Sequence, residues 1–187
     1  MLHVETEPSA LGPIAFAARD GKVVALEFGD EAFLADRLRR RCRGETPVRG
    51  DPLGVAGRLR RYFAGELDAV DDLPVELGGT PFQSQVWAVL RTIPAGTTLS
   101  YRDVAVRIGQ PTAVRAVGLA NGSNPVSIVV PCHRVIGADG SLTGYGGGID
   151  RKLWLLEHEG ARLRLGLSPA GAAAPGRDRG SAPAPRR

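Results

Sequence analysis

Residues 131–135 read Pro131-Cys132-His133-Arg134-Val135 and follow the apolar run Ile128-Val129-Val130. A cysteine beside a histidine and an arginine is a candidate nucleophile, because a thiol reacts as its thiolate and needs a nearby base or positive charge to form it. Packing alone can also explain such a residue, since buried cysteines are common and mostly inert. These five residues leave both interpretations open, and the surrounding chain has to decide between them.

The composition indicates a globular protein with a basic surface. The chain has 187 residues, 43% of them hydrophobic, and a formal net charge of +4, which suits one substantial domain or two small ones. A pI near 9.6 is compatible with a nucleic-acid partner. No stretch of about 20 apolar residues could span a bilayer, and the first ten residues lack the regions of a signal peptide. We therefore expect a cytoplasmic protein with no membrane partner.

The two cysteines, Cys42 and Cys132, lie far apart in a chain without an export signal. This favours reduced thiols over a disulfide. With only three histidines in addition, no closely spaced set of four zinc ligands is present, and we predict no metal site. Cys42 falls on the apolar face of a predicted helix. A thiol activated by the neighbouring arginines is the less favoured interpretation there.

The first part of the chain predicts a small sheet with helices. Ile14 to Arg19 and Lys22 to Phe28 alternate around the turn Asp20-Gly21, which is typical of a β-hairpin. Two amphipathic segments, 30–44 and 52–64, predict helices. Periodicity is lost over residues 68–79, so we predict an N-terminal domain over residues 1–78.

Three helices are predicted next, over 80–93, 100–108 and 112–122. Thr80-Pro81-Phe82-Gln83 combines an N-cap, a helix-starting proline and a capping box. The second and third helices, joined by a short turn, fit a helix-turn-helix, although helical hairpins in ordinary cores look similar. The third helix carries small residues around one long cation. Such a surface allows a ligand to approach the backbone closely, but it is also typical of tight packing between helices. These residues are Ala113, Ala116, Gly118 and the cation Arg115.

The remaining segments complete an α+β fold. Residues 144–148, Gly-Tyr-Gly-Gly-Gly, lack the lysine of a phosphate-binding loop, and we interpret them as a wall whose amides approach a ligand. Asp150 is predicted to cap a last helix that ends at Gly160. We expect a small N-terminal sheet-and-helix domain, then a mainly helical domain over 79–167 with a helix-turn-helix and a short active-site strand. Residues 168–187 predict a disordered tail.

An ordered set of motifs between residues 80 and 160 resembles the O6-alkylguanine-DNA alkyltransferases, or methylated-DNA--protein-cysteine methyltransferases. The resemblance is close there and faint before it, and it favours the nucleophile at position 132 over a core cysteine. The motifs are Pro81-Phe82-Gln83, Val86-Trp87, Ile93-Pro94-Ala95-Gly96-Thr97, Ser100-Tyr101, Arg115-Ala116-Val117-Gly118, Asn124-Pro125, residues 131–135, Gly144-Tyr145, Trp154-Leu155-Leu156 and His158-Glu159-Gly160.

The resemblance implies direct-reversal DNA repair, the activity of a methylated-DNA--[protein]-cysteine S-methyltransferase (EC 2.1.1.63). Cys132 would take the alkyl group from O6-alkylguanine in duplex DNA and keep it, so that each molecule acts once. O4-alkylthymine is a further candidate lesion. No cofactor is expected, because a thiolate displaces an alkyl carbon directly. The N-terminal domain would be ribonuclease H-like.

The resemblance also implies roles for individual residues around the lesion. His133 would act as a water-assisted base oriented by Glu159, and Tyr101 would donate a hydrogen bond to the leaving guanine. Asn124 would hold the recognition helix to the active-site strand. The main chain at Cys132 and Val135 would read the guanine edge, and a loop would close over the base; its residues are Tyr145, Gly146 and Gly147. Gly146 replaces a serine found in some relatives, which puts pocket size in doubt.

On the DNA side, the resemblance places the third helix in the minor groove and requires the damaged nucleotide to be flipped out of the stack. Arg115 would fill the vacated space. Ser100 and the small residues named above would face the DNA, and recognition would be nearly independent of flanking sequence. The protein is expected to act as a monomer, with cooperative binding to DNA left open.

Two other functions compete with repair. A helix-turn-helix regulator, or an alkyl-damage sensor without chemistry, would leave Cys132, His133 and Glu159 unexplained. A cysteine hydrolase would turn over and would show no preference for alkylated DNA. Neither accounts for the Arg115 helix beside the cysteine motif.

Overall fold

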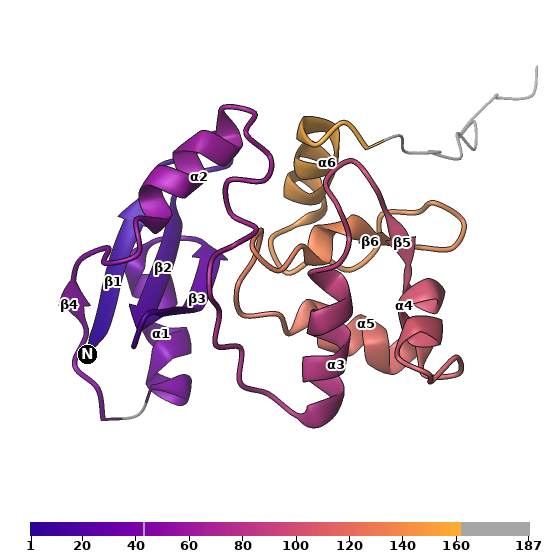
Figure 1. The fold of residues 1–187 in the computed structure, drawn as a ribbon, viewed down its shortest axis with the longest axis horizontal. Coiled ribbons are helices and arrows are strands. Elements are labelled where there is room, and N and C mark those ends of the chain that lie inside the picture. Colours follow the sequence, from indigo (N-terminus) through magenta and orange to yellow (C-terminus); the bar gives the residue numbers. More distant parts are fainter. Residues whose placement is uncertain (43, 162–187) are drawn as a thin grey trace, which may run out of the picture.

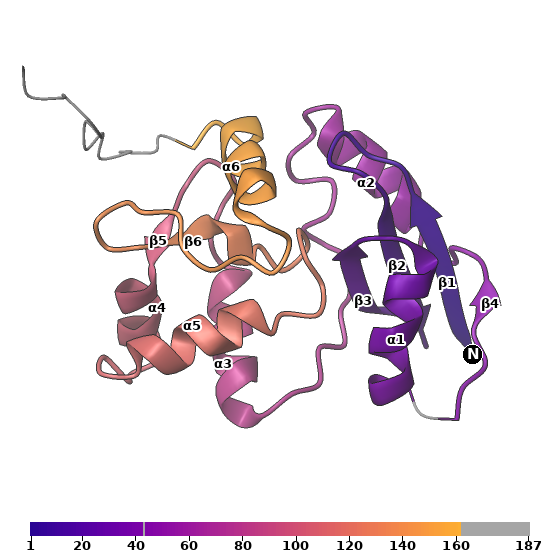
Figure 2. The same ribbon diagram turned by 180° about the vertical axis from the view of Figure 1, so that it is seen from behind.

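The computed structural model of the 187-residue chain describes residues 1–42 and 44–161. The predicted tail over 168–187 lies outside the described residues. Figures 1 and 2 show two halves side by side, a sheet with two helices and a mainly helical half. The fold is α+β, as expected. Among the described residues, no helix has the length and apolar character needed to cross a membrane.

The N-terminal half is a four-stranded sheet in the order β3-β2-β1-β4. The predicted hairpin is confirmed with the predicted bounds, as β2 (Ile14–Arg19) and β3 (Lys22–Phe28). β1 (Leu2–Glu7) pairs antiparallel with β2, and the short β4 (Val48–Arg49) pairs parallel with β1. Neither β1 nor β4 was predicted.

Two helices cover opposite faces of this sheet. Leu34 and Leu38 of α1 (Glu31–Arg41) pack in a small cluster with Ala15 and Ala17, whereas α2 (Val55–Phe63) packs in the main core with Ile14 and Phe16. Alternate residues of a strand point to opposite faces, so this division follows from the sequence of β2. Figure 2 shows α1 in front of the sheet, and Figure 1 shows α2 there.

The C-terminal half contains the predicted helices, with shifted ends. They are α3 (Pro81–Leu90), α4 (Tyr101–Arg107), α5 (Val114–Gly122) and α6 (Ile149–His158). Thr80 and Gln83 form the predicted capping box. The prediction that α3 reaches Ile93 was wrong, because residues 91–93 form a turn. The prediction that Asp150 caps α6 was also wrong. Gly148 is the N-cap, at φ 94°, and Asp150 lies in the first turn, where its charge favours the helix.

The segment around the cysteine is a series of turns that leads into the short strand. Ile128 has φ 69°, in the left-handed region, and the apolar run 128–130 forms no strand. Cys132–Arg134 is one turn of 3-10 helix, followed by β6 (Val135–Ile136). β6 pairs parallel with β5 (Leu99–Ser100), which leads directly into α4. This pairing ties the cysteine motif to the helix-turn-helix.

The main hydrophobic core is continuous between the two halves. It joins Phe16 and Tyr62 of the first half to Trp87, Val117 and Leu155 of the second. The two halves on either side of residue 78, where we predicted the domain boundary, therefore share one core. The boundary itself stays a prediction.

Candidate active site

Cys132 is held from the C-terminal end of α5. Its side chain is only 5% exposed, and its Sγ accepts a hydrogen bond from Asn124 Nδ2 at 3.1 Å. The same amide donates to Val130 O at 2.7 Å, and Asn121 Nδ2 donates to Cys132 O at 3.2 Å. Two asparagines thus fix both the thiol and its backbone relative to the helix. Asn124, two residues after α5, and Asn121, which sequence reasoning missed, both contact the cysteine turn.

The Cys132 thiol does not ionise readily by itself in this environment. Burial raises the pKa of Cys132 to about 11, although the Asn124 hydrogen bond and the Lys152 ammonium group act in the opposite direction. The thiol is therefore protonated at neutral pH in this state. A reaction at Sγ requires a base to remove its proton.

Glu159 and His133, which follows Cys132, form a buried hydrogen-bonded pair. Glu159 is the C-cap residue of α6, and its Oε1 lies 3.0 Å from His133 Nε2. Burial alone would raise the pKa of Glu159, but hydrogen bonds from His133 and Arg134 outweigh it and lower the pKa to about 2. The carboxylate is therefore charged at neutral pH and accepts from His133.

The tautomer of His133 follows from this contact. Burial lowers the pKa of His133 despite the neighbouring carboxylate, so the imidazole is neutral at pH 7. A neutral ring that donates from Nε2 keeps its lone pair on Nδ1. Nδ1 is buried, and within residues 1–42 and 44–161 it has no hydrogen-bond partner. It is therefore the basic atom of the imidazole.

Two more donors surround the Glu159 carboxylate, and both were missed from the sequence. Arg134 donates from Nε and Nη2 to its two oxygens, at 2.8 and 2.7 Å, and Tyr62 of α2 donates its hydroxyl at 2.7 Å. Arg134 was named as a candidate source of charge for the thiol, but the structure pairs it with Glu159. No local signal in the sequence distinguishes these two functions.

Lys152 is a buried cation whose charge acts on the Cys132 thiol. Its Nζ donates to Val135 O at 2.6 Å and to Thr143 O at 3.1 Å, and it lies 5.8 Å from the Tyr101 ring centroid. Burial lowers the pKa of Lys152 to about 8. The sequence did carry a signal for it, since Lys152, Leu155 and Glu159 share one face of α6 at helical spacing.

A narrow pocket leads from the surface to Cys132. It is lined by Asn124, Tyr145, Gly146 and Gly147 from the C-terminal half and also by residues of the sheet half, including Glu27 and Phe28. Its volume is about 30 Å³, which is room for a water molecule but not for a purine. A Cβ at Gly147 would lie 2.7 Å from the Tyr145 ring and 3.1 Å from the Phe28 ring. Glycine is therefore required where the loop closes the pocket.

Tyr101 and Val135 lie beside this pocket, with their polar groups engaged. The Tyr101 hydroxyl donates to Thr143 O at 3.0 Å. The Val135 N–H donates to Cys132 O, and Val135 O accepts from Lys152 Nζ at 2.6 Å. Burial raises the pKa of Tyr101, which keeps its hydroxyl protonated.

The predicted DNA-facing residues lie on the helix-turn-helix, outside the pocket. Arg115 and Ala116 are exposed on α5, while Ala113 and Gly118 are partly exposed. Ser100 is the N-cap of α4 and accepts a hydrogen bond from Asp103 N. The opposite face of α5 is buried through Val117, Ala120 and Asn121.

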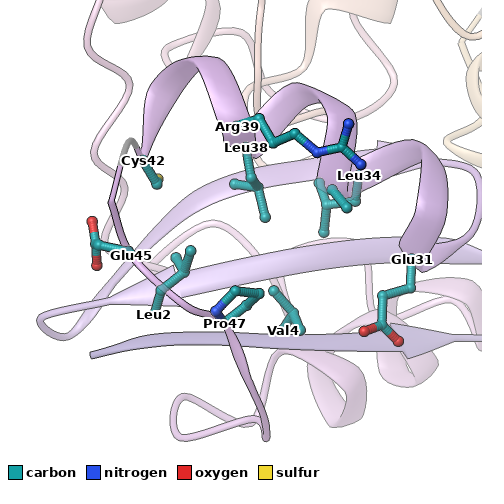
Figure 3. A pocket seen from close by; sticks show the side chains of 10 residues that line it. Leu2, Val4, Glu31, Leu34, Leu38, Arg39, Cys42, Glu45 and Pro47 are labelled. Atoms are coloured by element: carbon teal, nitrogen blue, oxygen red, sulfur yellow. The ribbon is translucent and has the colours of Figure 1, made fainter.

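A larger apolar pocket, of about 230 Å³, lies between α1 and β1, away from all of these residues (Figure 3). Cys42 lines it, and burial raises the pKa of the Cys42 thiol in spite of Arg19 nearby. This argues against the arginine-activated thiol considered for Cys42. In the described part of the chain, no group of three or more His, Cys, Asp or Glu side chains could hold a metal ion.

Known proteins resemble the chain in sequence. A family model described as "6-O-methylguanine DNA methyltransferase, DNA binding domain" matches residues 81–161. A methylated-DNA--protein-cysteine methyltransferase of Mycobacterium tuberculosis is 48% identical over 168 residues, which cover 90% of this chain and 98% of the relative. The Shigella flexneri protein of that name is 60% identical over 113 residues, 60% of this chain and 66% of the relative.

Solved structures resemble it in fold. The crystal structure of the Mycobacterium tuberculosis O6-methylguanine methyltransferase matches with a TM-score of 0.73 and 47% identity, covering 86% of this chain and 93% of the other. A structure of the M. tuberculosis protein in complex with DNA matches with a TM-score of 0.73 and 46% identity, covering 84% and 92%.

Proposed function

The chain belongs to the methylated-DNA--protein-cysteine methyltransferase family, and on that premise we propose that it repairs duplex DNA by moving the alkyl group of O6-alkylguanine onto Cys132 Sγ. The observation that carries this proposal is the buried thiol, which Asn124 holds at 3.1 Å on the same turn as His133, the partner of Glu159. O4-alkylthymine is the second candidate lesion.

The base system supplies the thiolate. His133 Nδ1 takes the proton from Cys132 through one water molecule, and Glu159 stabilises the imidazolium that results. The unpaired Nδ1 atom and the strongly acidic Glu159 support this order. Asn124 and the Lys152 charge then stabilise the thiolate, because both favour the ionised form.

The transfer itself is one displacement. Sγ attacks the alkyl carbon, an S–C bond forms, and the bond from that carbon to guanine O6 breaks. Tyr101 leaves Thr143 O and donates a hydrogen bond to the departing guanine, while the main chain at Cys132 and Val135 reads the guanine edge. A thioether has no ready leaving group in this site, so the protein acts once. This chemistry asks for no cofactor.

DNA binds to the exposed face of the helix-turn-helix. One monomer inserts α5 into the minor groove, where the small residues Ala113, Ala116 and Gly118 allow close approach and Arg115 fills the space left by the flipped nucleotide. The closed pocket of about 30 Å³ indicates that the loop formed by Tyr145, Gly146 and Gly147 opens before a base enters.

Intact-mass measurement with peptide mapping tests the proposal, using duplex DNA that contains one O6-methylguanine. We expect a gain of one methyl group on Cys132 that stops at one equivalent. Cys132→Ala should bind the DNA and gain nothing. Cys42→Ala is the matched control and should still accept one methyl group.

Methyl transfer to Cys132→Ala, or repair of many equivalents by one protein molecule, would contradict the proposal. Binding without any transfer by the unmodified protein would favour the damage sensor or regulator instead.

A further inference from the structure

The exposed face of α5 carries one large apolar side chain among the small ones. Leu119 is 78% exposed, although leucine is a residue that folded proteins usually bury. It follows Arg115 by one helical turn, and residues four apart are neighbours on a helix surface. A leucine on a helix leans toward the preceding turn, so Leu119 projects beside Arg115.

The backbone that carries Leu119 is fixed relative to the reactive cysteine. The next residue, Ala120, accepts a hydrogen bond from Trp87 Nε1 at 2.8 Å, and Asn121 donates to Cys132 O at 3.2 Å. Ala120 and Asn121, which make these contacts, are both buried on the inner face of α5. When a lesion lies at Cys132, Leu119 therefore has one defined place on the DNA.

We propose that Leu119 packs on the floor of the minor groove beside the flipped nucleotide and disfavours a G·C pair at the position it faces. This rests on the proposed function, which places α5 in that groove. In the minor groove an A·T pair shows only acceptors, whereas a G·C pair adds the guanine 2-amino group. That group projects into the space a leucine occupies, and an apolar side chain cannot accept its hydrogen bond.

Repair therefore depends on the neighbouring base pair, in contrast to the nearly sequence-independent recognition expected from a helix face of small residues alone. The preference is carried by one side chain outside the pocket. The reaction of Cys132 with a free alkylated guanine base does not involve it.

Single-turnover methyl transfer on three sets of duplexes tests the inference. Each duplex holds one O6-methylguanine, and the sets differ in the base pairs that flank it, which are A·T, G·C or hypoxanthine·C. A hypoxanthine·C pair is a G·C pair without the 2-amino group. At one flanking position we expect A·T and hypoxanthine·C to react faster than G·C by roughly fivefold or more. Leu119→Ala should lose most of that preference while reacting normally with the free base.

The duplexes also differ in stability, but this affects the unmodified protein and its variants alike. A change of preference between the proteins therefore reports on the side chain that was replaced. Val106→Ala is the matched control, since Val106 is 56% exposed on the adjoining helix α4, which crosses the backbone in helix-turn-helix docking. It should keep the preference. An equal preference in Leu119→Ala and the unmodified protein would overturn the inference. Failure of every protein to react with any duplex would instead overturn the proposed function and the inference with it.

Discussion

The Glu159 carboxylate is the most heavily bonded group of the site. It accepts from Tyr62, His133 and Arg134, and all three donors are buried. A buried charge of this kind is tolerated because both carboxylate oxygens accept hydrogen bonds and an arginine neutralises the charge. In the proposed mechanism Glu159 has two functions, since it orients His133 for catalysis and also compensates the charge of Arg134.

Glu159→Gln separates these functions by pH. The amide can still accept from His133 but leaves the Arg134 charge unpaired, so we expect a stability loss of about 3 kcal/mol at pH 7 and slower transfer. The folded pKa of Glu159 is lowered to about 2 from 4.5. Its contribution is fully present above about pH 4.5 and is lost as the pH falls toward 2.

Urea unfolding of both proteins between pH 7 and pH 3 measures this difference. The gap in unfolding free energy should narrow as the pH falls. A gap that stays constant would show that the charge of Glu159 does not carry the effect.

The effect of a nearby charge on the Cys132 thiol can also be tested at Lys152. Its ammonium group lowers the pKa of Cys132, and its Nζ joins Val135 O to Thr143 O. Lys152→Met should shift the pH-rate profile of methyl transfer to higher pH and slow the reaction at pH 7 by about tenfold, the equivalent of one pKa unit. Lys152→Arg keeps the charge and should shift the profile less. Equal profiles for the two variants would assign Lys152 a packing role only.

Local signals in the sequence located most helices but not the segment around the cysteine. The Thr80 capping box and the Asp20-Gly21 turn each depend on a few neighbouring residues, and both were predicted correctly. The apolar run 128–130 is buried through turns, because the left-handed Ile128 and the hydrogen bond from Val130 N to Val126 O bend the chain. Burial, and not strand pairing, explains its apolar composition.

The packing of α1 on the sheet is incomplete, and this gives a stability prediction. The pocket of about 230 Å³ in Figure 3 is lined by Leu34, Ala35 and Leu38 of α1. Ala35→Leu should fill part of it and raise the free energy of unfolding by about 1 kcal/mol. Ala32→Leu is the matched control, because Ala32 is exposed on the same helix and does not line the pocket. Thermal unfolding of both variants measures the effect, and an equal change in the two would show that filling the pocket contributes nothing.

The site depends on both halves of the molecule, which sequence motifs alone do not reveal. Tyr62 of α2 donates to Glu159, and the Glu27 and Phe28 side chains line the pocket of Cys132. The resemblance indicated Cys132, His133 and Glu159 as a set, and the structure places Glu159 against His133, the residue after Cys132. It gave no indication of Tyr62, which is 97 positions from its partner, and only the fold brings the two together.

Alkylation of Cys132 should therefore loosen the whole molecule, in proportion to the size of the group. The pocket of about 30 Å³ is closed by Tyr145 and Gly147 on one side and Phe28 on the other. A methyl group replaces the thiol proton and weakens the Asn124 contact, whereas a benzyl group also has to displace the loop or separate it from the sheet half. Overpacking of this kind costs about 1–3 kcal/mol.

We expect the melting temperature to fall from free protein to S-methyl to S-benzyl protein, and protease sensitivity of the loop over residues 144–148 to rise in the same order. Cys132→Ala, mixed with the same alkyl donors, controls for effects of the reagents on other residues. A benzylated protein that melted at or above the melting temperature of the free protein would contradict this prediction. It would show that opening the pocket costs no free energy and that the closed loop contributes nothing to stability.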